Sequence, residues 1–185
     1  MKTVYMYNNG LRGVLPDSIG NWENITSLQI SGNAMLTGGL PSSLARWTQL
    51  EELYAYDSQL NGSLPSLGAW TQLRVLDVFG NNFSGTLPSA LSNLQSLRVF
   101  NIDRNRFGGG LLPALPFGAL KQCQLLNSLA TSRARGAGNA FKCPWPEGAT
   151  DVCKKYDGKL WVPITDLDCD STSGRAVSTS SGAVG

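Results

Sequence analysis

Histidine is absent from this chain of 185 residues, and cysteine is scarce, with four residues that all lie in the last third. Without histidine the protein lacks the commonest general base, the Ser-His and Cys-His nucleophile pairs, and metal sites built on imidazole. No two cysteines have the Cys-x-x-Cys spacing of a zinc site, so the composition favours disulfide bonds over zinc. We therefore expect no bound metal and no histidine-based catalysis.

Charge and long apolar runs are also limited. Charged residues make up 15% of the chain, and the net charge of +2 is spread without a basic run, which argues against a nucleic-acid partner. No apolar run approaches the roughly 18 residues of a membrane span, and no charged start precedes a hydrophobic stretch of the signal-peptide type. With 42% hydrophobic residues, the chain fits one globular domain.

Paired carboxylates are the remaining route to acid-base catalysis. The closest clusters are Glu51-Glu52 and Asp166-x-Asp168. Adjacent residues on a strand point to opposite faces, and nothing in the sequence indicates a cleft around either cluster. We predict that the protein is not an enzyme and needs no cofactor, and that these carboxylates are solvated.

One stretch, residues 73–96, contains the pattern that recurs along the first two thirds of the chain. Leu76 and Val78 lie two apart on an extended segment and face one core, while the residue between them faces solvent. Asn81 follows in a turn, where its amide has donors and acceptors for buried backbone groups. Pro88 then precedes a short helical segment. Each such coil buries its leucines only against its neighbours, so the pattern predicts a solenoid.

The pattern, written LxxLxLxxNxLxGxLPxxLxxL, resembles the plant-type leucine-rich repeat. Its Leu-Pro step recurs at Leu15-Pro16, Leu40-Pro41, Leu64-Pro65, Leu87-Pro88 and Leu112-Pro113. The resemblance implies an α/β solenoid, a right-handed superhelix with a concave parallel sheet and a short helical or irregular convex side. About five repeats occupy residues 1–115, so we expect five parallel strands. Asparagine is expected at position 58, but Ser58 stands there.

The last third departs from the repeat. After two prolines, the apolar residues from Phe117 to Leu129 predict a helix of about four turns. An abbreviated coil returns at Asn139, so residues 116–169 form a helix plus a C-terminal cap. The even number of cysteines predicts disulfides in this cap, in one of three possible pairings of Cys123, Cys143, Cys153 and Cys169. Residues 170–185 are rich in Ser, Thr and Gly and are expected to form a flexible tail.

Two features bear on the compartment. The first coil keeps the repeat spacing from Met1 without a polar capping unit, so we expect further repeats and a signal peptide upstream. Three Asn-x-Ser/Thr triplets are candidate glycosylation sites, at Asn24, Asn61 and Asn82. We place Asn24 and Asn61 off the strands. Together with paired cysteines, these triplets favour a secreted or cell-surface glycoprotein.

The resemblance also bears on function. It extends to the ectodomains of plant receptor kinases, polygalacturonase-inhibiting proteins and trypanosomatid-like protist surface antigens, which are non-catalytic. It implies an extracellular recognition module that binds a protein, peptide or glycan on its concave face. A structural surface or matrix spacer is the alternative, and an inhibitor of a secreted cell-wall hydrolase is the third. Trp22, Trp47 and Trp70 depart from the plant pattern, in which leucine is usual.

Strand alternation predicts which residues face solvent on the concave side. The two rows are Tyr5, Gln29, Tyr54, Asp77 and Asn101, and Tyr7, Ser31, Tyr56, Phe79 and Asp103. The candidate ligand site therefore comprises Tyr5, Tyr7, Tyr54, Tyr56, Asp77, Phe79, Asn101 and Asp103. Its predicted centre is Tyr54, Tyr56 and Phe79, because clustered aromatics are typical of recognition surfaces. Aromatic residues also favour strands for packing reasons alone, so this alternative stays open.

Overall fold

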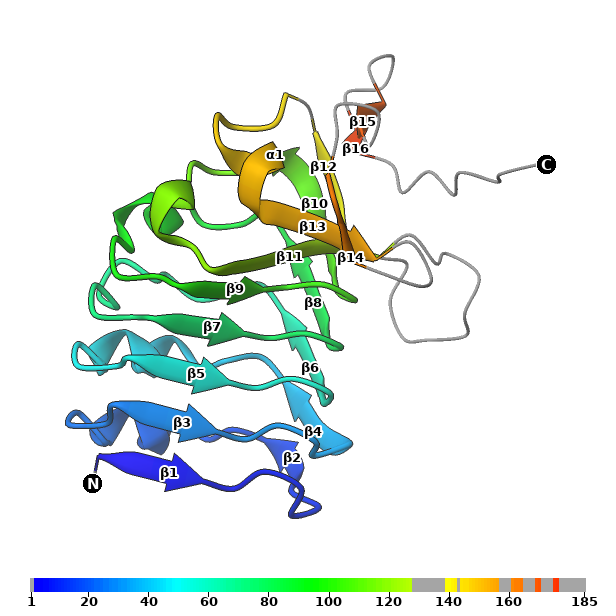
Figure 1. Ribbon diagram of the computed structural model, residues 1–185. Coiled ribbons are helices and arrows are strands. Elements are labelled where there is room, and N and C mark those ends of the chain that lie inside the picture. The colour runs from blue at the N-terminus through cyan, green and yellow to red at the C-terminus, as the bar shows by residue number, and fades with distance from the viewer. Residues whose placement is uncertain are drawn as a thin grey trace.

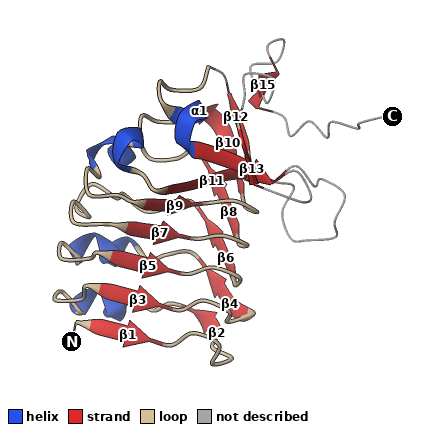
Figure 2. Ribbon diagram, viewed as in Figure 1, coloured by secondary structure: helices blue, strands red, loops and turns tan. Residues whose placement is uncertain are grey.

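The computed structural model describes residues 2–127, 139–142, 144–156, 161–164, 169–170 and 175–176. The chain winds into a solenoid whose successive coils stack upon one another (Figure 1). An eight-stranded sheet and a six-stranded sheet run along it, and helical turns lie on the side where the strands of the longer sheet begin (Figure 2). The solenoid with a long parallel sheet confirms the predicted fold class.

The eight-stranded sheet takes one parallel strand from each coil up to β13, and the last strand pairs antiparallel with β13. In order, they are β1 (Thr3–Tyr5), β3 (Ser27–Gln29), β5 (Glu52–Tyr54), β7 (Val75–Asp77), β9 (Val99–Asn101), β11 (Gln122–Asn127), β13 (Cys153–Tyr156) and β14 (Trp161–Pro163). Equivalent leucines pair in register, as Leu28, Leu53 and Leu76 do, and these side chains are buried. Because the sheet continues through β11 and β13, it is longer than the five parallel strands predicted.

The six-stranded sheet forms a second wall and is also parallel. Its strands are β2 (Arg12–Val14), β4 (Met35–Gly38), β6 (Gln59–Gly62), β8 (Asn82–Gly85), β10 (Arg106–Leu111) and β12 (Ala140–Lys142). Phe83 and Phe107 point inward and stack at 6.1 Å between ring centroids. We had predicted an irregular or short helical segment here. Short stretches that contain glycine have low strand propensity alone, and pairing arises because stacked coils place equivalent backbones side by side.

Helical turns complete the coils. They are the 3₁₀ helices η1 (Asp17–Asn21), η2 (Ser42–Arg46), η3 (Ser89–Asn93) and η4 (Phe117–Ala119), and the short α-helix α1 (Ala149–Val152). A proline immediately precedes each 3₁₀ helix, where its fixed φ suits the first turn. The unusual tryptophans are polar partners as well as core residues. Trp47 Nε1 donates to the Ile19 carbonyl at 3.2 Å, and Trp70 Nε1 donates to the Leu44 carbonyl at 2.9 Å, so both indoles are buried with their N–H groups satisfied.

A column of asparagines joins the coils inside the turns. The Asn81 side-chain amide donates to the carbonyls of Ala55 at 2.7 Å and Val78 at 3.0 Å, one in the preceding coil and one in its own. Asn33, Asn105 and Asn139 each donate to carbonyls of the preceding and the same coil in this way. This column was predicted, as was the return of the pattern at Asn139. Ser58 instead donates to Tyr56 O at 3.5 Å.

The predicted helix from Phe117 to Leu129 is wrong over the residues that the structure describes. Only Phe117–Ala119 is helical, and Gln122–Asn127 is the strand β11. Leu120, Cys123 and Leu125 are buried and have the spacing of Leu97, Phe100 and Ile102, so this is a further coil with a cysteine at a core position. Residues separated by three positions fit a helix as well as this coil, which is why periodicity alone misled the prediction.

A disulfide links Cys123 to Cys153, 30 residues apart, across the paired strands β11 and β13. Both cysteines are buried at core positions, so the bond replaces a leucine contact between coils. Cys143 lies outside the described residues. Cys169 begins β15 (Cys169–Asp170), which pairs antiparallel with β16 (Arg175–Ala176) inside the stretch predicted to be a flexible tail. The rest of that tail beyond residue 170 lies outside the described residues.

Candidate functional site

The eight-stranded sheet has one face against the core and one face away from it, which we call the open face. Register places Tyr5, Gln29, Tyr54 and Asp77 side by side on four neighbouring strands. Neighbouring strands lie about 4.8 Å apart, so these four side chains span roughly 15 Å. The predicted row of side chains is therefore present in the predicted order.

The open face is aromatic over the first coils. Tyr5 is 62% exposed, Tyr7 51% and Tyr56 38%, while Tyr54 and Phe79 are partly buried. Ser31 lies between Tyr7 and Tyr56 in the second row and is buried, with its Oγ accepting the Tyr56 N–H at 3.2 Å. Thus five predicted site residues with rings stand on one surface at accessible or partly accessible positions.

Two predicted site residues do not face solvent. Asn101 is 6% exposed and Asp103 is 1% exposed. Asn101 accepts a hydrogen bond from the Asp103 N–H at 3.4 Å and donates one to the Asp77 carboxylate. The guanidinium of Arg104 lies 5.0 Å from the centroid of the Phe79 ring. Strand alternation sets the direction of a side chain, but neighbouring side chains decide its exposure, and here they cover both residues.

One residue in the turn after each of the first five strands of the eight-stranded sheet has a left-handed backbone conformation, and the sequence analysis did not predict these positions. Its members are Asn8 (φ 53°), Gly32 (φ 68°), Asp57 (φ 49°), Gly80 (φ 66°) and Arg104 (φ 51°). A Cβ on Gly80 would lie within 2.4 Å of Asp57 Oδ1, so Asp57 occupies space that a side chain at position 80 would need. The Gly-Asn pairs that begin at positions 32 and 80 could have indicated these turns, because glycine adopts a left-handed conformation without strain.

Burial disfavours the charged form of three carboxyl groups near the ends of these strands. Burial raises the pKa of Asp77 to about 6, against hydrogen bonds from the Phe79 N–H and Asn101, with a smaller raising effect of Asp57. Burial likewise raises the pKa of Asp103 to about 6, although the Arg104 N–H and the Arg104 charge oppose this. Burial raises the pKa of Asp57 as well, again against Arg104. Arg104 is thus the cation that partly compensates Asp57 and Asp103.

Tyr54 stands at the centre of a second set of interactions. Burial raises its pKa first, followed by the charges of Glu52 and Asp77 and by Tyr56 and Tyr5. Register places Asp77 directly beside Tyr54, and Glu52 and Tyr56 lie two residues before and after it, while Tyr5 stands two strands away on β1. We call Tyr5, Glu52, Tyr54, Tyr56 and Asp77 the tyrosine–carboxylate cluster. It combines aromatic faces with two carboxylates on neighbouring strands.

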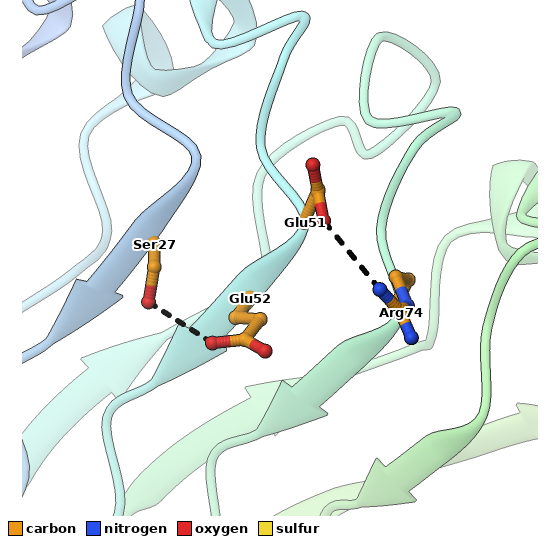
Figure 3. A network of polar contacts seen from close by, with 4 residues as sticks. All are labelled: Ser27, Glu51, Glu52 and Arg74. Carbon is orange, nitrogen blue, oxygen red and sulfur yellow. Dashed lines mark hydrogen bonds and ion pairs between the residues drawn. The ribbon is translucent and has the colours of Figure 1, made fainter. Parts of the chain in front are cut away.

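Glu51 and Glu52 have separate partners, as Figure 3 shows. The Ser27 hydroxyl donates to Glu52 Oε2 at 3.1 Å, and Arg74 Nη1 lies 3.7 Å from Glu51 Oε2 in an exposed ion pair. A pair of catalytic carboxylates would instead converge on one point. Asp166 and Asp168 lie outside the described residues.

The three candidate glycosylation sites differ in their surroundings. Asn24 and Asn61 are exposed, while Asn82 is half-buried with its Oδ1 in the interior and no hydrogen-bond partner among the described residues. Asn61 lies on β6 and pairs in register with Asn82 on β8, which corrects the expectation that it lies off the strands. Both belong to the six-stranded sheet, so a glycan there would leave the open face of the longer sheet clear.

Comparison with known proteins identifies the repeat. A model of the Leucine Rich Repeat family matches residues 1–22 and 72–94, which are the first coil and the stretch from which the repeat was derived. Solved structures with the same architecture are ectodomains of plant receptor kinases. The chain therefore contains leucine-rich repeats and is similar to plant proteins of this type. No curated protein matches the whole sequence at a significant level.

Three solved structures set the scale of the likeness. The ectodomain of the Arabidopsis thaliana receptor kinase SOBIR1 is 28% identical to the leucine-rich-repeat protein, with a TM-score of 0.55 over 58% of each chain. PEPR1 bound to AtPEP1 is 26% identical, with a TM-score of 0.62 over 78% of this chain and 19% of that one. Pollen receptor kinase 3, at 21% identity, shares the fold with a TM-score of 0.71 over 91% of this chain and 79% of that one.

The chain spans less than two thirds of the length of several of these relatives, from 58% of the SOBIR1 ectodomain to 19% of PEPR1. Within the described residues, no helix has both the length and the apolar character needed to cross a membrane. The similarity therefore covers the repeat architecture and leaves the ligand to be argued from the open face.

Proposed function

We propose that this leucine-rich-repeat protein is an extracellular, non-enzymatic recognition module that binds a protein or peptide through the open face of its eight-stranded sheet. The observation that carries the proposal is the exposure of Tyr5 at the end of β1, and of Tyr7 and Tyr56 just after β1 and β5, on the side that also holds Tyr54 and Phe79. If aromatic residues were present only because they favour strands, we would expect their rings to be packed against the core. The rings of Tyr5, Tyr7 and Tyr56 are exposed instead.

Tyrosine is well suited to this role. Its ring supplies a large contact area, its hydroxyl forms hydrogen bonds, and only two side-chain torsions are fixed on binding. Aromatic residues at the centre of an interface commonly contribute 2 kcal/mol or more to affinity. Five rings on or just after β1, β5 and β7 therefore suffice for a peptide-sized contact.

The comparisons support a protein or peptide ligand over other classes. PEPR1 was solved as a complex with AtPEP1, and the Arabidopsis receptor kinase HAESA with the peptide hormone IDA and the co-receptor SERK1. The BIR3–SERK2 complex joins two such proteins. A buried disulfide and exposed glycosylation triplets at Asn24 and Asn61 favour the secretory route for this chain.

Peptide selection tests the proposal. A displayed library of random linear peptides is selected on the wild-type protein, and the enriched peptides are titrated by calorimetry. In the double variant Tyr54→Ala/Tyr56→Ala, affinity should fall by roughly 2 kcal/mol, about thirtyfold, while the melting temperature changes little. The control is Val14→Ala/Met35→Ala, which removes exposed apolar side chains from the six-stranded sheet.

Retention of full affinity in the tyrosine double variant would place the site elsewhere. Failure to enrich any peptide or protein on the open face would favour the structural spacer instead, because a spacer needs no chemically consistent surface.

A further inference from the structure

The open face carries a local charge opposite to that of the protein. The whole chain has a net charge of +2, yet the open face over β5 and β7, with the turn after β5, carries the carboxylates Glu52, Asp57 and Asp77. Asp103 is buried, and the guanidinium of Arg104 acts on Asp57 and Asp103. Other cations nearby are engaged at the strand starts. Arg74 pairs with Glu51, and Arg98 donates to the carbonyls of Gln95 and Leu97.

The carboxylates of the tyrosine–carboxylate cluster are held in place. The Ser27 hydroxyl donates to Glu52 Oε2 at 3.1 Å, and the Phe79 N–H donates to Asp77 Oδ1 at 3.2 Å. The Asn101 amide is a further donor to Asp77. Register places Tyr54 directly beside Asp77, and Glu52 lies two residues before Tyr54 on the same strand. Both carboxylates therefore flank one ring, Tyr56 follows two residues later, and Tyr5 lies two strands away on β1.

The tyrosine–carboxylate cluster has no lysine or arginine among its members, and a further carboxylate, that of Asp103, is buried in the turn after the next strand. Asp103 is 1% exposed, and its Oδ1 is buried with no hydrogen-bond partner among the described residues. By strand alternation its side chain projects from the same row as Tyr56 and Phe79. Burial is the main cause of the raised pKa values of Asp57, Asp77 and Asp103, and the Arg104 charge opposes it only at Asp57 and Asp103. A cation placed beside Glu52 and Asp77 would stabilise the charged forms of these carboxylates.

We propose that the tyrosine–carboxylate cluster is a subsite selective for a cationic side chain, lysine or arginine, of an extended peptide that crosses the parallel strands. The aliphatic stem of such a side chain packs on the rings of Tyr54 and Tyr56, and its charged end lies between Glu52 and Asp77. Aromatic faces attract cations, and the two carboxylates add to this attraction. The inference rests on the proposed function and specifies the chemistry of its ligand.

Three defined probes test the selectivity. Twelve-residue peptides of glycine and serine carry three evenly spaced lysines, norleucines or glutamates and are otherwise identical. Each is titrated into the ¹⁵N-labelled full chain and followed by amide chemical shifts. The lysine peptide should shift resonances of β5 and β7, and the norleucine and glutamate peptides should not. Equal binding of the lysine and norleucine peptides would overturn the proposal.

Matched variants locate the charge effect. Glu52→Gln and Asp77→Asn keep the hydrogen-bond acceptors but remove the charge, and each should weaken the lysine peptide at least fivefold. Glu147→Gln removes the same charge from an exposed position in the C-terminal part and should have no effect. Glu52→Lys should reverse the preference toward the glutamate peptide. A loss in Glu147→Gln as large as that in Asp77→Asn would show unspecific attraction and contradict the subsite.

The outcomes also separate this inference from the proposed function. If selected peptides depend on Tyr54 and Tyr56 but show no preference for lysine or arginine, the open face is a recognition surface and the cationic subsite is wrong. If the lysine peptide binds normally to the Tyr54→Ala/Tyr56→Ala variant, the cationic subsite is wrong, and if the selected peptides also keep full affinity for it, both are wrong.

Discussion

Substitution of Asn81 by serine should destabilise the solenoid more than the same substitution of Asn105. The two asparagines make matched contacts. Asn81 donates to the carbonyls of Ala55, Val78 and Phe79 and accepts the Leu60 N–H, while Asn105 donates to three carbonyls and accepts the Phe83 N–H. Serine is a fair replacement because it occupies the column naturally at position 58.

The difference lies in which carbonyls keep a donor. Val78 O accepts from both Asn81 and Asn105, and Ile102 O accepts from both Asn105 and Asn139, so Asn105→Ser leaves each with one amide donor. Ala55 O has its side-chain donor from Asn81, since Ser58 donates to Tyr56 O. Asn81→Ser therefore leaves the Ala55 carbonyl unpaired. A buried unpaired carbonyl costs about 1–3 kcal/mol beyond the loss that the two variants share.

Urea unfolding of both variants measures this difference, with equal m-values as the check that the transitions are comparable. We expect the free energy of unfolding of Asn81→Ser to be about 1–3 kcal/mol below that of Asn105→Ser. Adding Ser58→Asn should recover part of the loss in Asn81→Ser but little in Asn105→Ser. Equal costs, or no coupling between positions 58 and 81, would refute the shared-carbonyl reasoning.

Two further predictions concern burial and packing. Asp103→Asn should raise the free energy of unfolding at pH 7 by about 1–3 kcal/mol, because burial raises the pKa of Asp103 to about 6 and the folded state holds an unfavourable charge above that pH. The gain should vanish as pH falls to 4, where the wild-type carboxyl is protonated in the fold; a gain of the same size in urea unfolding at both values would contradict it. Gly20→Ala should cost about 1–3 kcal/mol, since its Cβ would lie 2.7 Å from the Ser43 carbonyl oxygen and force η1 from η2. Gly118→Ala in η4, with no atom within 4 Å, is the control and should be neutral in thermal unfolding.

Local spacing was enough to predict the repeated coil. Leu76 and Asn81 each take one position in the pattern, and every coil repeats the same two requirements, a buried apolar side chain and a paired turn. The strand β11 was missed because Leu120 and its neighbours satisfy two periods at once. The six-stranded sheet was missed because its pairing exists only between stacked coils and leaves little trace within any one of them.

The sequence predicted on which face of the sheet the candidate site residues lie, but not how exposed their side chains are. Alternation correctly placed Tyr54 beside Asp77 on the open face. It did not predict that Asn101 and Asp103 are covered, because burial depends on contacts between coils, such as the hydrogen bond from Asn101 to Asp77. Such contacts depend on which side chains meet across coils, and the sequence of one coil does not contain that information.

The bond between Cys123 and Cys153 has a mechanical consequence. Coils held only by stacking detach from a solenoid one at a time when its end is pulled, each at a modest force. The strands β11 and β13 are joined covalently, so neither can be peeled from the other by tension. A force applied along the solenoid axis would therefore unravel the stack of coils from β1 toward β9 stepwise and stop at a clamp. The molecule therefore resists separation where β11 and β13 are linked, and it yields to force at its first coils.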